Sequence, residues 1–275
     1  MFSVLLLTLN EERNLPACLA SLTGCDDIVV LDSGSTDRTS AIAKTAETRF
    51  FTRAFTDFAD QRNFALETIV FKHEWVFHLD ADEQLTPELL RECATLSAEN
   101  PAQLDGHYAA PRMLFHGRWI PHCTDFPAYQ ARFGHARRFR FVQIGHGQRE
   151  HPGLRLSHLR ANYLHNLSAH TDAELEEKHR RYARQEAAAF LARPRETTSL
   201  ARRLVSANPL LRRRAIKTLS QHLPARGLLR FLYQFGWRRG FLDGRAGLDY
   251  CLLLARYEHG VAAEIRRQRR ATVSA

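Results

Sequence analysis

Short apolar runs alternate with amphipathic stretches along the first third of the chain. The apolar runs predict buried strands at residues 4–9, 28–31 and 75–79, and residues 48–52 predict a further strand with a weaker pattern. Continuous apolar runs of this length are typical of strands that are covered on both faces. Helix-forming patterns with suitable start and stop residues separate them, at residues 14–22, 39–46 and 57–69. This strand–helix alternation predicts a doubly wound, mainly parallel α/β sheet.

Polar residues gather where three of these strands end. Thr8 and Asn10 end the first strand, Asp32 ends the second, and Asp80 and Asp82 follow the fourth. Open parallel sheets bind ligands beyond the carboxyl ends of their strands. Clustered carboxylates repel one another, and a cation or the donors of a ligand would relieve that repulsion. The alternative, that Asp32 and Asp80 only cap turns, stays open for each aspartate taken alone.

The Asp80-Ala81-Asp82 sequence is a candidate metal site. Alternate residues just beyond a strand can aim two carboxylates at one point, although an isolated Asp-x-Asp is often solvated turn chemistry. Mg²⁺ and Mn²⁺ prefer oxygen ligands and often retain waters and substrate phosphates. The chain has neither GxxxxGK[ST] nor GxGxxG. We therefore expect a nucleotide diphosphate held with a divalent metal, Mg²⁺ or Mn²⁺.

Several segments carry a family resemblance. Four in the front third look like motifs of family 2 glycosyltransferases: Leu7-Thr8-Leu9-Asn10-Glu11, Val30 to Asp37, Gln61-Arg62-Asn63, and Leu79 to Glu83. Three later ones resemble the branch with lipopolysaccharide-core β-1,4-glucosyltransferases: Gly117 to Ile120, Tyr129 to Arg132, and Gly240 to Gly247. The resemblance implies a GT-A fold with a mixed sheet. It also implies inverting transfer of a sugar, usually a hexose, from a UDP-sugar.

The resemblance further implies roles for single residues. Thr8, Asn10 and Glu11 would line the nucleotide base and ribose, and Asp32 would recognise the base. Arg62 would lie near the base or the diphosphate, although the exposed face of the third helix is an alternative place for it. The complete nucleotide-sugar set is Thr8, Asn10, Glu11, Asp32, Arg62, Asp80 and Ala81, and the metal ligands are Asp82 and Asp80.

Inversion needs a base that takes the proton of the acceptor hydroxyl. Relatives carry a Val-His-Glu motif in the region where this chain reads Ile-Gly-His-Gly-Gln-Arg-Glu-His. His146 falls on the histidine of that motif, but Gly147 replaces its glutamate. We expect Glu150 to be the base, with Asp125 in reserve and His146 as base or diphosphate contact. An ion pair of Glu150 with a neighbouring arginine is the alternative.

Charge divides the chain sharply. Residues 1–105 carry 8 basic and 18 acidic side chains, whereas residues 106–275 carry 31 and 12. Arginines mix with aromatic and apolar positions at helical spacing along residues 211–223 and 228–241. Such a surface suits an anionic membrane interface. There are two alternatives: the apolar faces pack on the catalytic domain, or the surface binds nucleic acid. We expect that the protein does not bind nucleic acid.

These patterns predict two domains and a location. Residues 1–195 would form the catalytic domain, with a nucleotide-sugar half (1–105) and an acceptor half (106–195). Residues 196–275 would form a basic helical extension. Five cysteines without CxxC spacing, and 14 histidines without HExxH, argue against disulfides and zinc. The N-terminal apolar run is a poor signal peptide. We expect a cytoplasmic protein on the inner face of the cytoplasmic membrane.

The predicted function is inverting transfer of a hexose from a nucleotide-sugar to an envelope glycan, lipopolysaccharide core or exopolysaccharide, or to its lipid-linked precursor. A sugar nucleotidyltransferase is one alternative, but it would want a glycine-rich, basic loop where residues 10–13 are largely acidic. A nucleic-acid-binding protein is the other, and it leaves the carboxylates at the strand ends unexplained.

Overall fold

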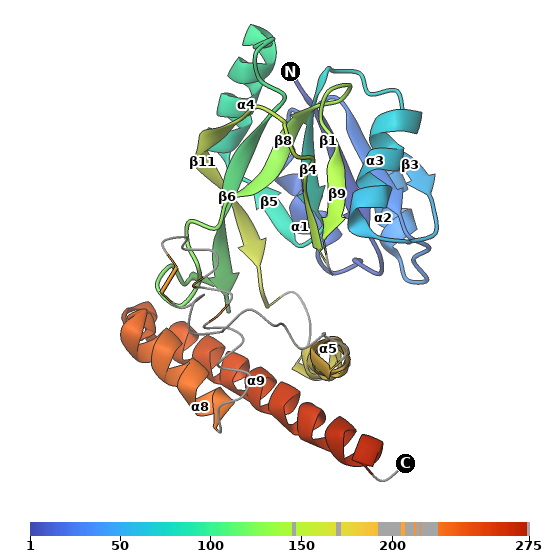
Figure 1. Cartoon of the computed structure of the whole chain (residues 1–275). Helices are drawn as coiled ribbons and strands as arrows, with labels where there is room; N and C mark the ends of the chain where they lie inside the picture. Colours follow the sequence, from blue (N-terminus) through green and yellow to red (C-terminus); the bar gives the residue numbers. More distant parts are fainter. Residues whose placement is uncertain are drawn as a thin grey trace. The chain divides into compact units, whose positions relative to one another are not determined.

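The computed structural model describes residues 1–144, 147–168, 172–191, 205–206, 212, 215 and 225–273 (Figure 1). The chain forms two compact units. The first comprises residues 1–119 and 125–169, and the second comprises residues 120–124 and 170–275. Each unit is described by itself. The functional division at residue 195 stays a prediction.

Four parallel strands form one half of the sheet in the first unit. In spatial order they are β3 (Arg49–Thr52), β2 (Ile28–Asp32), β1 (Ser3–Thr8) and β4 (Trp75–Asp80). The connecting helices are α1 (Leu15–Ala20), α2 (Thr39–Thr45) and α3 (Phe58–Thr68). The predicted strands, helices and parallel pairing are confirmed.

The other half of the sheet is mixed. Its elements are β5 (Glu83–Leu85), α4 (Pro87–Glu99), β6 (Gly106–Phe115), β7 (Arg118–Trp119), β8 (Gln130–His135) and β11 (Leu156–Asn166). The spatial order continues from β4 through β8, β6 and β11 to β5, with β8 antiparallel to both neighbours. A separate hairpin joins β9 (Phe141–Ile144) to β10 (Gly147–Glu150). The predicted mixed sheet is thus confirmed.

Strand β4 shows how the two faces of the sheet differ. Trp75, Phe77 and Leu79 are buried in the core that also holds residues of α1 and α4. Val76 points to the opposite face and packs with residues of α3. Because side chains alternate along a strand, His78 and Asp80 lie on the α3 face as well. This alternation brings the end of β4 next to the helix that carries Arg62.

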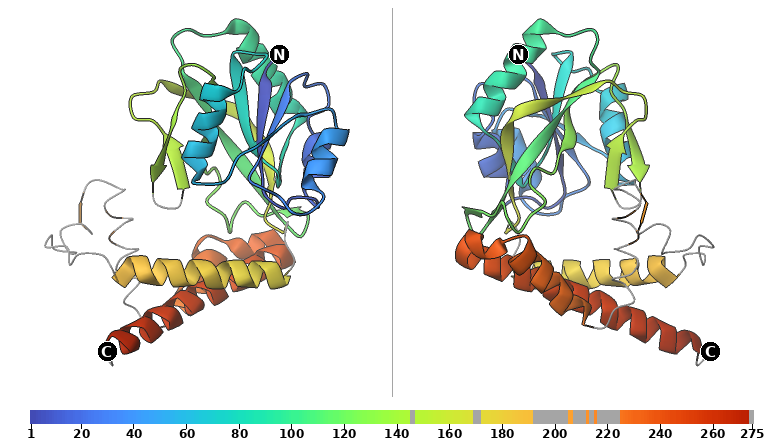
Figure 2. Two further views of the ribbon diagram at one scale, coloured as in Figure 1. Left: turned by 90° about the vertical axis from the view of Figure 1, so that its right-hand side faces the viewer. Right: turned by 60° about the vertical axis from the view of Figure 1, so that its left-hand side comes forward.

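The second unit is helical. Its described elements are α5 (Asp172–Leu191), α8 (Arg226–Phe231), the π-helical turn η1 (Leu232–Trp237), the 3₁₀ turn η2 (Gly240–Asp243) and α9 (Gly244–Val273). Helices α5 and α9 lie side by side (Figure 2), with Ala183, Ala187, Val261 and Ile265 buried between them. The C-terminal helical extension is therefore confirmed. The expected helix at 211–223 lies outside the described residues, apart from residues 212 and 215.

Asp243 ties residues 120–124 into this unit. Its carboxylate accepts hydrogen bonds from the backbone N–H groups of His122 (3.0 Å) and Cys123 (2.8 Å). A contact of 2.6 Å joins it to His122 Nδ1. No helix within the described ranges is long and apolar enough to cross a bilayer.

Candidate active site at the carboxyl ends of the strands

The register of the parallel strands places the predicted polar residues together. Thr8 lies opposite Asp32, and Leu7 lies opposite Asp80. Thr8 Oγ1 donates a hydrogen bond of 2.7 Å to Asp32 Oδ1. The ends of β1, β2 and β4 therefore meet at one end of the sheet, as the strand pattern predicted.

Asp32 organises the loop that follows β2. Its Oδ2 accepts from the backbone N–H groups of Gly34 (2.9 Å) and Ser35 (2.7 Å). Its Oδ1 accepts from Ser35 Oγ (2.5 Å) in addition to Thr8. The carboxylate is 2% exposed, and these four bonds occupy its acceptor positions. These contacts agree with the interpretation that Asp32 caps the turn after β2. Recognition of the nucleotide base by Asp32 stays a prediction.

The loop after β1 is fastened to the loop after β2. Asn10 has a left-handed backbone (φ 56°), a conformation that Asn tolerates better than most residues. Its side-chain Oδ1 accepts from Thr36 N (2.8 Å), and its N–H donates to Ser35 Oγ (2.8 Å). Glu11 N donates to Thr39 Oγ1 at 2.8 Å. Asn10 and Glu11 are therefore held in place without a ligand.

Two arginines converge on the carboxylates that end β4. Arg62 Nη2 lies 2.6 Å from Asp80 Oδ1. Arg132 Nη2 lies 3.0 Å from Asp80 Oδ2 and 2.7 Å from Glu83 Oε1. The Arg62 side chain is 1% exposed, so its alternative place on the exposed face of the third helix is wrong. Arg62 points inward because α3 packs its buried face against the sheet, and Ala81 is buried beside Asp80.

Burial and charge set the pKa values within this network. Burial favours the neutral form of Asp80, but Arg132 and Arg62 together hold the pKa of Asp80 well below its usual range. Burial raises the pKa of Glu83 to about 7, against the opposing effect of Arg132. Asp80 is consequently ionised at neutral pH, whereas burial makes Glu83 harder to ionise than Asp80.

The polar groups of this network are incompletely paired. Among the described residues, Arg62 Nε and Nη1 and both ring nitrogens of His78 are buried without a hydrogen-bond partner. A buried unpaired donor costs about 1–3 kcal/mol, and native structures keep few of them. The chain alone therefore leaves donor capacity unused next to Asp80.

Asp82 lies beside a histidine that the sequence did not single out. His165 of β11 pairs in register with Glu83, and its Nε2 is 3.4 Å from Asp82 Oδ2. Burial favours neutral His165, but the hydrogen bond to Asp82 and the charge of Glu83 raise its pKa to about 9. The sequence treated His165 as one of many scattered histidines, because no short motif links it to Asp82.

The network offers limited ligands for a metal ion. No group of three or more His, Cys, Asp or Glu residues in the described ranges is arranged to hold one. Both oxygens of Asp80 already contact arginines, whereas the Asp82 side chain is 24% exposed. Asp82 fits a divalent ion that takes its other ligands from phosphates and water. His165 is protonated at neutral pH, so its imidazole could join the same ion only after it had lost that proton. Direct coordination by Asp80 stays a prediction, and one guanidinium contact would have to open.

The three candidate bases differ in their surroundings. Glu150 is half-buried at the end of β10, and its Oε1 accepts a hydrogen bond of 2.7 Å from Tyr108 Oη. Within the described part of the chain no ion pair joins Glu150 to Arg149. Asp125 is exposed between β7 and β8. His146 lies outside the described residues.

Residues 3–149 match the family Glycosyl transferase family 2. The lipopolysaccharide core biosynthesis glycosyltransferase LpsC of Rhizobium meliloti (strain 1021) is 39% identical over 105 residues, which are 35% of this chain and 38% of that protein. An uncharacterized glycosyltransferase of Rickettsia bellii (strain RML369-C) is 34% identical over 91 residues, 33% of this chain and 30% of that protein. The chain thus matches little more than a third of these relatives' length.

Similar solved structures include S. aureus TarS 1-349 in complex with UDP, with 17% identity and a TM-score of 0.47 over 96% of this chain and 89% of that one. Another is glucosyl-3-phosphoglycerate synthase from Mycobacterium tuberculosis with Mn²⁺ and UDP, with 21% identity and a TM-score of 0.33 over 42% and 44%. The family match covers more than half of the chain and agrees with the sequence motifs. The chain therefore belongs to glycosyl transferase family 2.

Proposed function

We propose that this protein transfers a hexose, with inversion, from a UDP-sugar to a hydroxyl group of an envelope glycan, lipopolysaccharide core or exopolysaccharide. The observation that carries the proposal is the joining of Asp80, Arg62 and Arg132 at the carboxyl end of β4 in a family 2 chain. The name of the LpsC relative supports the choice of glycan.

The donor would bind across the ends of β1, β2 and β4. The last residues of β1 and β2, Thr8 and Asp32, would receive the base and ribose together with Asn10 and Glu11 of the loop after β1. Ala81 would form part of the floor. Arg62 supplies buried positive charge and unused N–H groups close to the diphosphate. Preorganised donors of this kind stabilise charge that develops in a transition state.

A divalent cation, Mg²⁺ or Mn²⁺, would be held by Asp82, with Asp80 as the second predicted ligand, and His165 would join only if the ion displaced its proton. Asp82 lies beside the arginine network and retains solvent access. When bound, such an ion offsets charge on the departing diphosphate. Asp80 contributes by fixing Arg62 and Arg132 next to that charge.

Glu150 would act as the base. The acceptor hydroxyl transfers its proton to the Glu150 carboxylate as its oxygen bonds to the sugar C1 and the C1–diphosphate bond breaks. Tyr108 holds Oε1, so that Oε2 is left to accept the proton. Asp125 is the reserve base, and His146 is a candidate diphosphate contact.

The first test is calorimetric titration with UDP, UDP-glucose and GDP in Mn²⁺, Mg²⁺ or EDTA. We expect UDP binding that requires the metal and is lost in Asp82→Ala. Asp249→Ala is the matched control, because Asp249 has a similarly exposed side chain (31%) in the second unit. Absence of nucleotide binding under every condition would contradict the proposal. Release of pyrophosphate from UTP with a sugar phosphate would favour the nucleotidyltransferase alternative.

We also propose that the second unit associates with an anionic membrane at the cytoplasmic face. Six apolar or aromatic side chains of α8, η1 and η2 are between 45% and 82% exposed: Leu228, Leu232, Tyr233, Trp237, Phe241 and Leu242. Arg239 lies among them in sequence and is exposed. Arg245 follows them, is exposed as well, and forms an ion pair with Asp249. An apolar surface with arginines matches the interface of an anionic bilayer.

Co-sedimentation with liposomes tests the membrane proposal. Vesicles that contain phosphatidylglycerol should bind the protein at low salt and release it as the salt concentration rises. Trp237→Ala should weaken binding, whereas Trp119→Ala in the first unit should not. No co-sedimentation at low salt would refute the proposal. Tight, metal-independent binding of an oligonucleotide would favour the nucleic-acid alternative.

A further inference from the structure

Three aromatic rings form a cluster next to Glu150. Tyr108 comes from β6, Tyr129 immediately precedes β8, and His158 comes from β11. The rings of Tyr108 and His158 are 5.0 Å apart and tilted by 31°. Those of Tyr129 and His158 are 4.5 Å apart and meet edge to face at 82°. Strands β6 and β11 and the residue before β8 thus contribute to one aromatic cluster, in which the rings of Tyr129 and His158 meet nearly at a right angle.

This cluster faces solvent on one side and Glu150 on the other. Tyr129 is 42% exposed, and His158 is exposed as well. Tyr108 is half-buried and donates its hydroxyl to Glu150. The aromatic surface therefore continues directly into the carboxylate that is the proposed base.

Strand register places the cluster at the same end of the sheet as the donor residues. Strand β8 runs antiparallel to β4, with Phe133 opposite Phe77. Tyr129, just before β8, therefore lies toward the end of β4 that carries Asp80. Tyr108 pairs with Ala131 on the other side of β8. Strand β8 is the one strand between β4 and β6 in the sheet. Tyr108 on β6 is therefore one strand away from Asp80 on β4.

An exposed aromatic surface beside a carboxylate suits a sugar. The C–H face of a pyranose is apolar and packs on an aromatic ring, while its hydroxyl groups form hydrogen bonds with nearby polar side chains. Ligand sites commonly combine aromatic walls with a few polar groups of this kind. A purely structural cluster would gain most by burying its rings, which Tyr129 and His158 do not do.

We propose that Tyr129 and His158 form a platform on which the acceptor pyranose stacks, with its reactive hydroxyl directed at Glu150. The inference rests on the proposed function and assigns the acceptor subsite to this cluster. Tyr129 and His158 then determine which acceptor is accepted, whereas the donor contacts lie across β8. Tyr108 is a positioning residue, because it acts through Glu150.

The test separates acceptor binding from donor binding. The probe is core oligosaccharide released by mild acid from a deep-rough lipopolysaccharide, observed by saturation-transfer difference NMR with UDP and Mn²⁺ present. We expect the wild-type protein to bind it, and Tyr129→Ala and His158→Ala to bind about tenfold more weakly, the loss of one stacked ring. Tyr129→Phe keeps the ring and should retain binding. UDP affinity should be unchanged throughout.

Tyr182→Ala is the matched control, because Tyr182 is equally exposed (41%) but lies on α5 of the second unit. Unchanged oligosaccharide binding in both Tyr129→Ala and His158→Ala would overturn the platform. Binding of UDP without any binding of the oligosaccharide by the wild-type protein would also overturn it, and would leave the donor proposal standing. Failure of the wild-type protein to bind UDP would instead count against the proposed function.

Discussion

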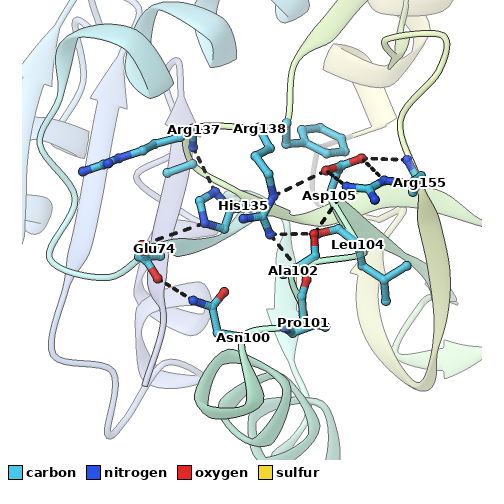
Figure 3. A network of polar contacts seen from close by, with 12 residues as sticks. Glu74, Asn100, Pro101, Ala102, Leu104, Asp105, His135, Arg137, Arg138 and Arg155 are labelled. Atoms are coloured by element: carbon cyan, nitrogen blue, oxygen red, sulfur yellow. Dashed lines mark hydrogen bonds and ion pairs between the residues drawn. The ribbon is translucent and has the colours of Figure 1, made fainter.

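The two ends of the sheet in the first unit each hold arginines on carboxylates, but in different surroundings. At the amino ends of β6 and β11, Asp105 accepts from Arg155 N (2.9 Å) and lies 3.4 Å from Arg138 Nε (Figure 3). The Arg155 and Arg138 side chains are 58% and 32% exposed. Arg138 also donates to the carbonyl of Leu104 at 2.8 Å. The arginines of this network reach solvent, its carboxylate is buried, and the contacts fasten two loops.

At the carboxyl end of β4 the arginines are buried, although the Asp80 side chain is 32% exposed. Arg62 is 1% exposed and Arg132 is 5% exposed, and Arg62 retains buried N–H groups without partners in the described residues. Water screens the more exposed arginines of the first network more strongly than the buried arginines of the second. The comparison teaches that burial of the arginines, rather than the number of ion pairs or unpaired donors, distinguishes the end of the sheet at which we propose that the donor binds.

The largest difference between the two ends should appear in stability. Arg132→Met leaves Asp80 and Glu83 with one buried cation fewer, and we expect it to lower the free energy of unfolding by about 3–5 kcal/mol. Arg138→Met, at the end with the exposed arginines, should cost about 1 kcal/mol or less. Urea denaturation of both variants measures the two values. Equal losses of unfolding free energy in the two variants would contradict the distinction between the buried and the exposed arginines.

Chemistry should be confined to the carboxyl end. Glu150→Gln keeps an acceptor for Tyr108 but removes the base, so we expect turnover to fall by a factor of about 100. UDP affinity and Tm should be unchanged. Steady-state kinetics with UDP-sugar and core oligosaccharide measure the effect. An unaffected rate would move the base to Asp125, which Asp125→Asn then tests.

Asp105→Asn should lower stability and leave turnover unchanged, the reverse of what we expect for Glu150→Gln. Loss of the carboxylate charge weakens the contacts with Arg155 and Arg138, and we expect about 2 kcal/mol lower stability. Turnover of the folded enzyme should be unchanged, because Asp105 lies at the far ends of the strands. Kinetics at a temperature well below the lowered Tm check this. A large loss of turnover would show that the two ends are coupled.

The smallest effect concerns pH and two histidines near the amino end of β4. Burial lowers the pKa of His107, against the charge of Glu92, and lowers that of His135, which lies near Glu74 and Arg138. Below about pH 6.5, the ordinary histidine pKa, the unfolded chain then binds more protons than the folded one. The free energy of unfolding therefore decreases as the pH is lowered through this range.

Each of these histidines can add at most about 1.4 kcal/mol per pH unit. Urea denaturation between pH 5 and 7.5 should show this slope, and His107→Leu should flatten it. A slope that is unaffected by the substitution would assign the pH dependence to other groups.

Local pattern was enough to predict the front of the fold. Buried strands such as β1 and β4 are mostly apolar, and both end in polar residues that precede a turn. The mixed half was predicted only through the family resemblance, because β8, β9 and β10 are short and lack a strong period. Asp32 and Asp80 could be placed at one end of the sheet because parallel strands share that end.

The partners of those residues could not be predicted from local pattern. Arg132 meets Asp80 across 52 positions and Glu83 across 49, and Arg62 turns inward only because α3 packs on the sheet. His165 reaches Asp82 through the pairing of β11 with β5. Glu150 lies at the end of strand β10 and is held by Tyr108 of β6, and its neighbours in sequence indicate neither fact.

The sequence by itself determined the strand–helix order, the acidic strand ends and the family, since each depends on residues that are close together in the chain. The tertiary structure decided which charges are buried, which donors lack partners and which rings stand beside Glu150. Those properties depend on strand register and helix packing, which bring together side chains that are far apart in sequence. Local sequence patterns therefore cannot predict these contacts.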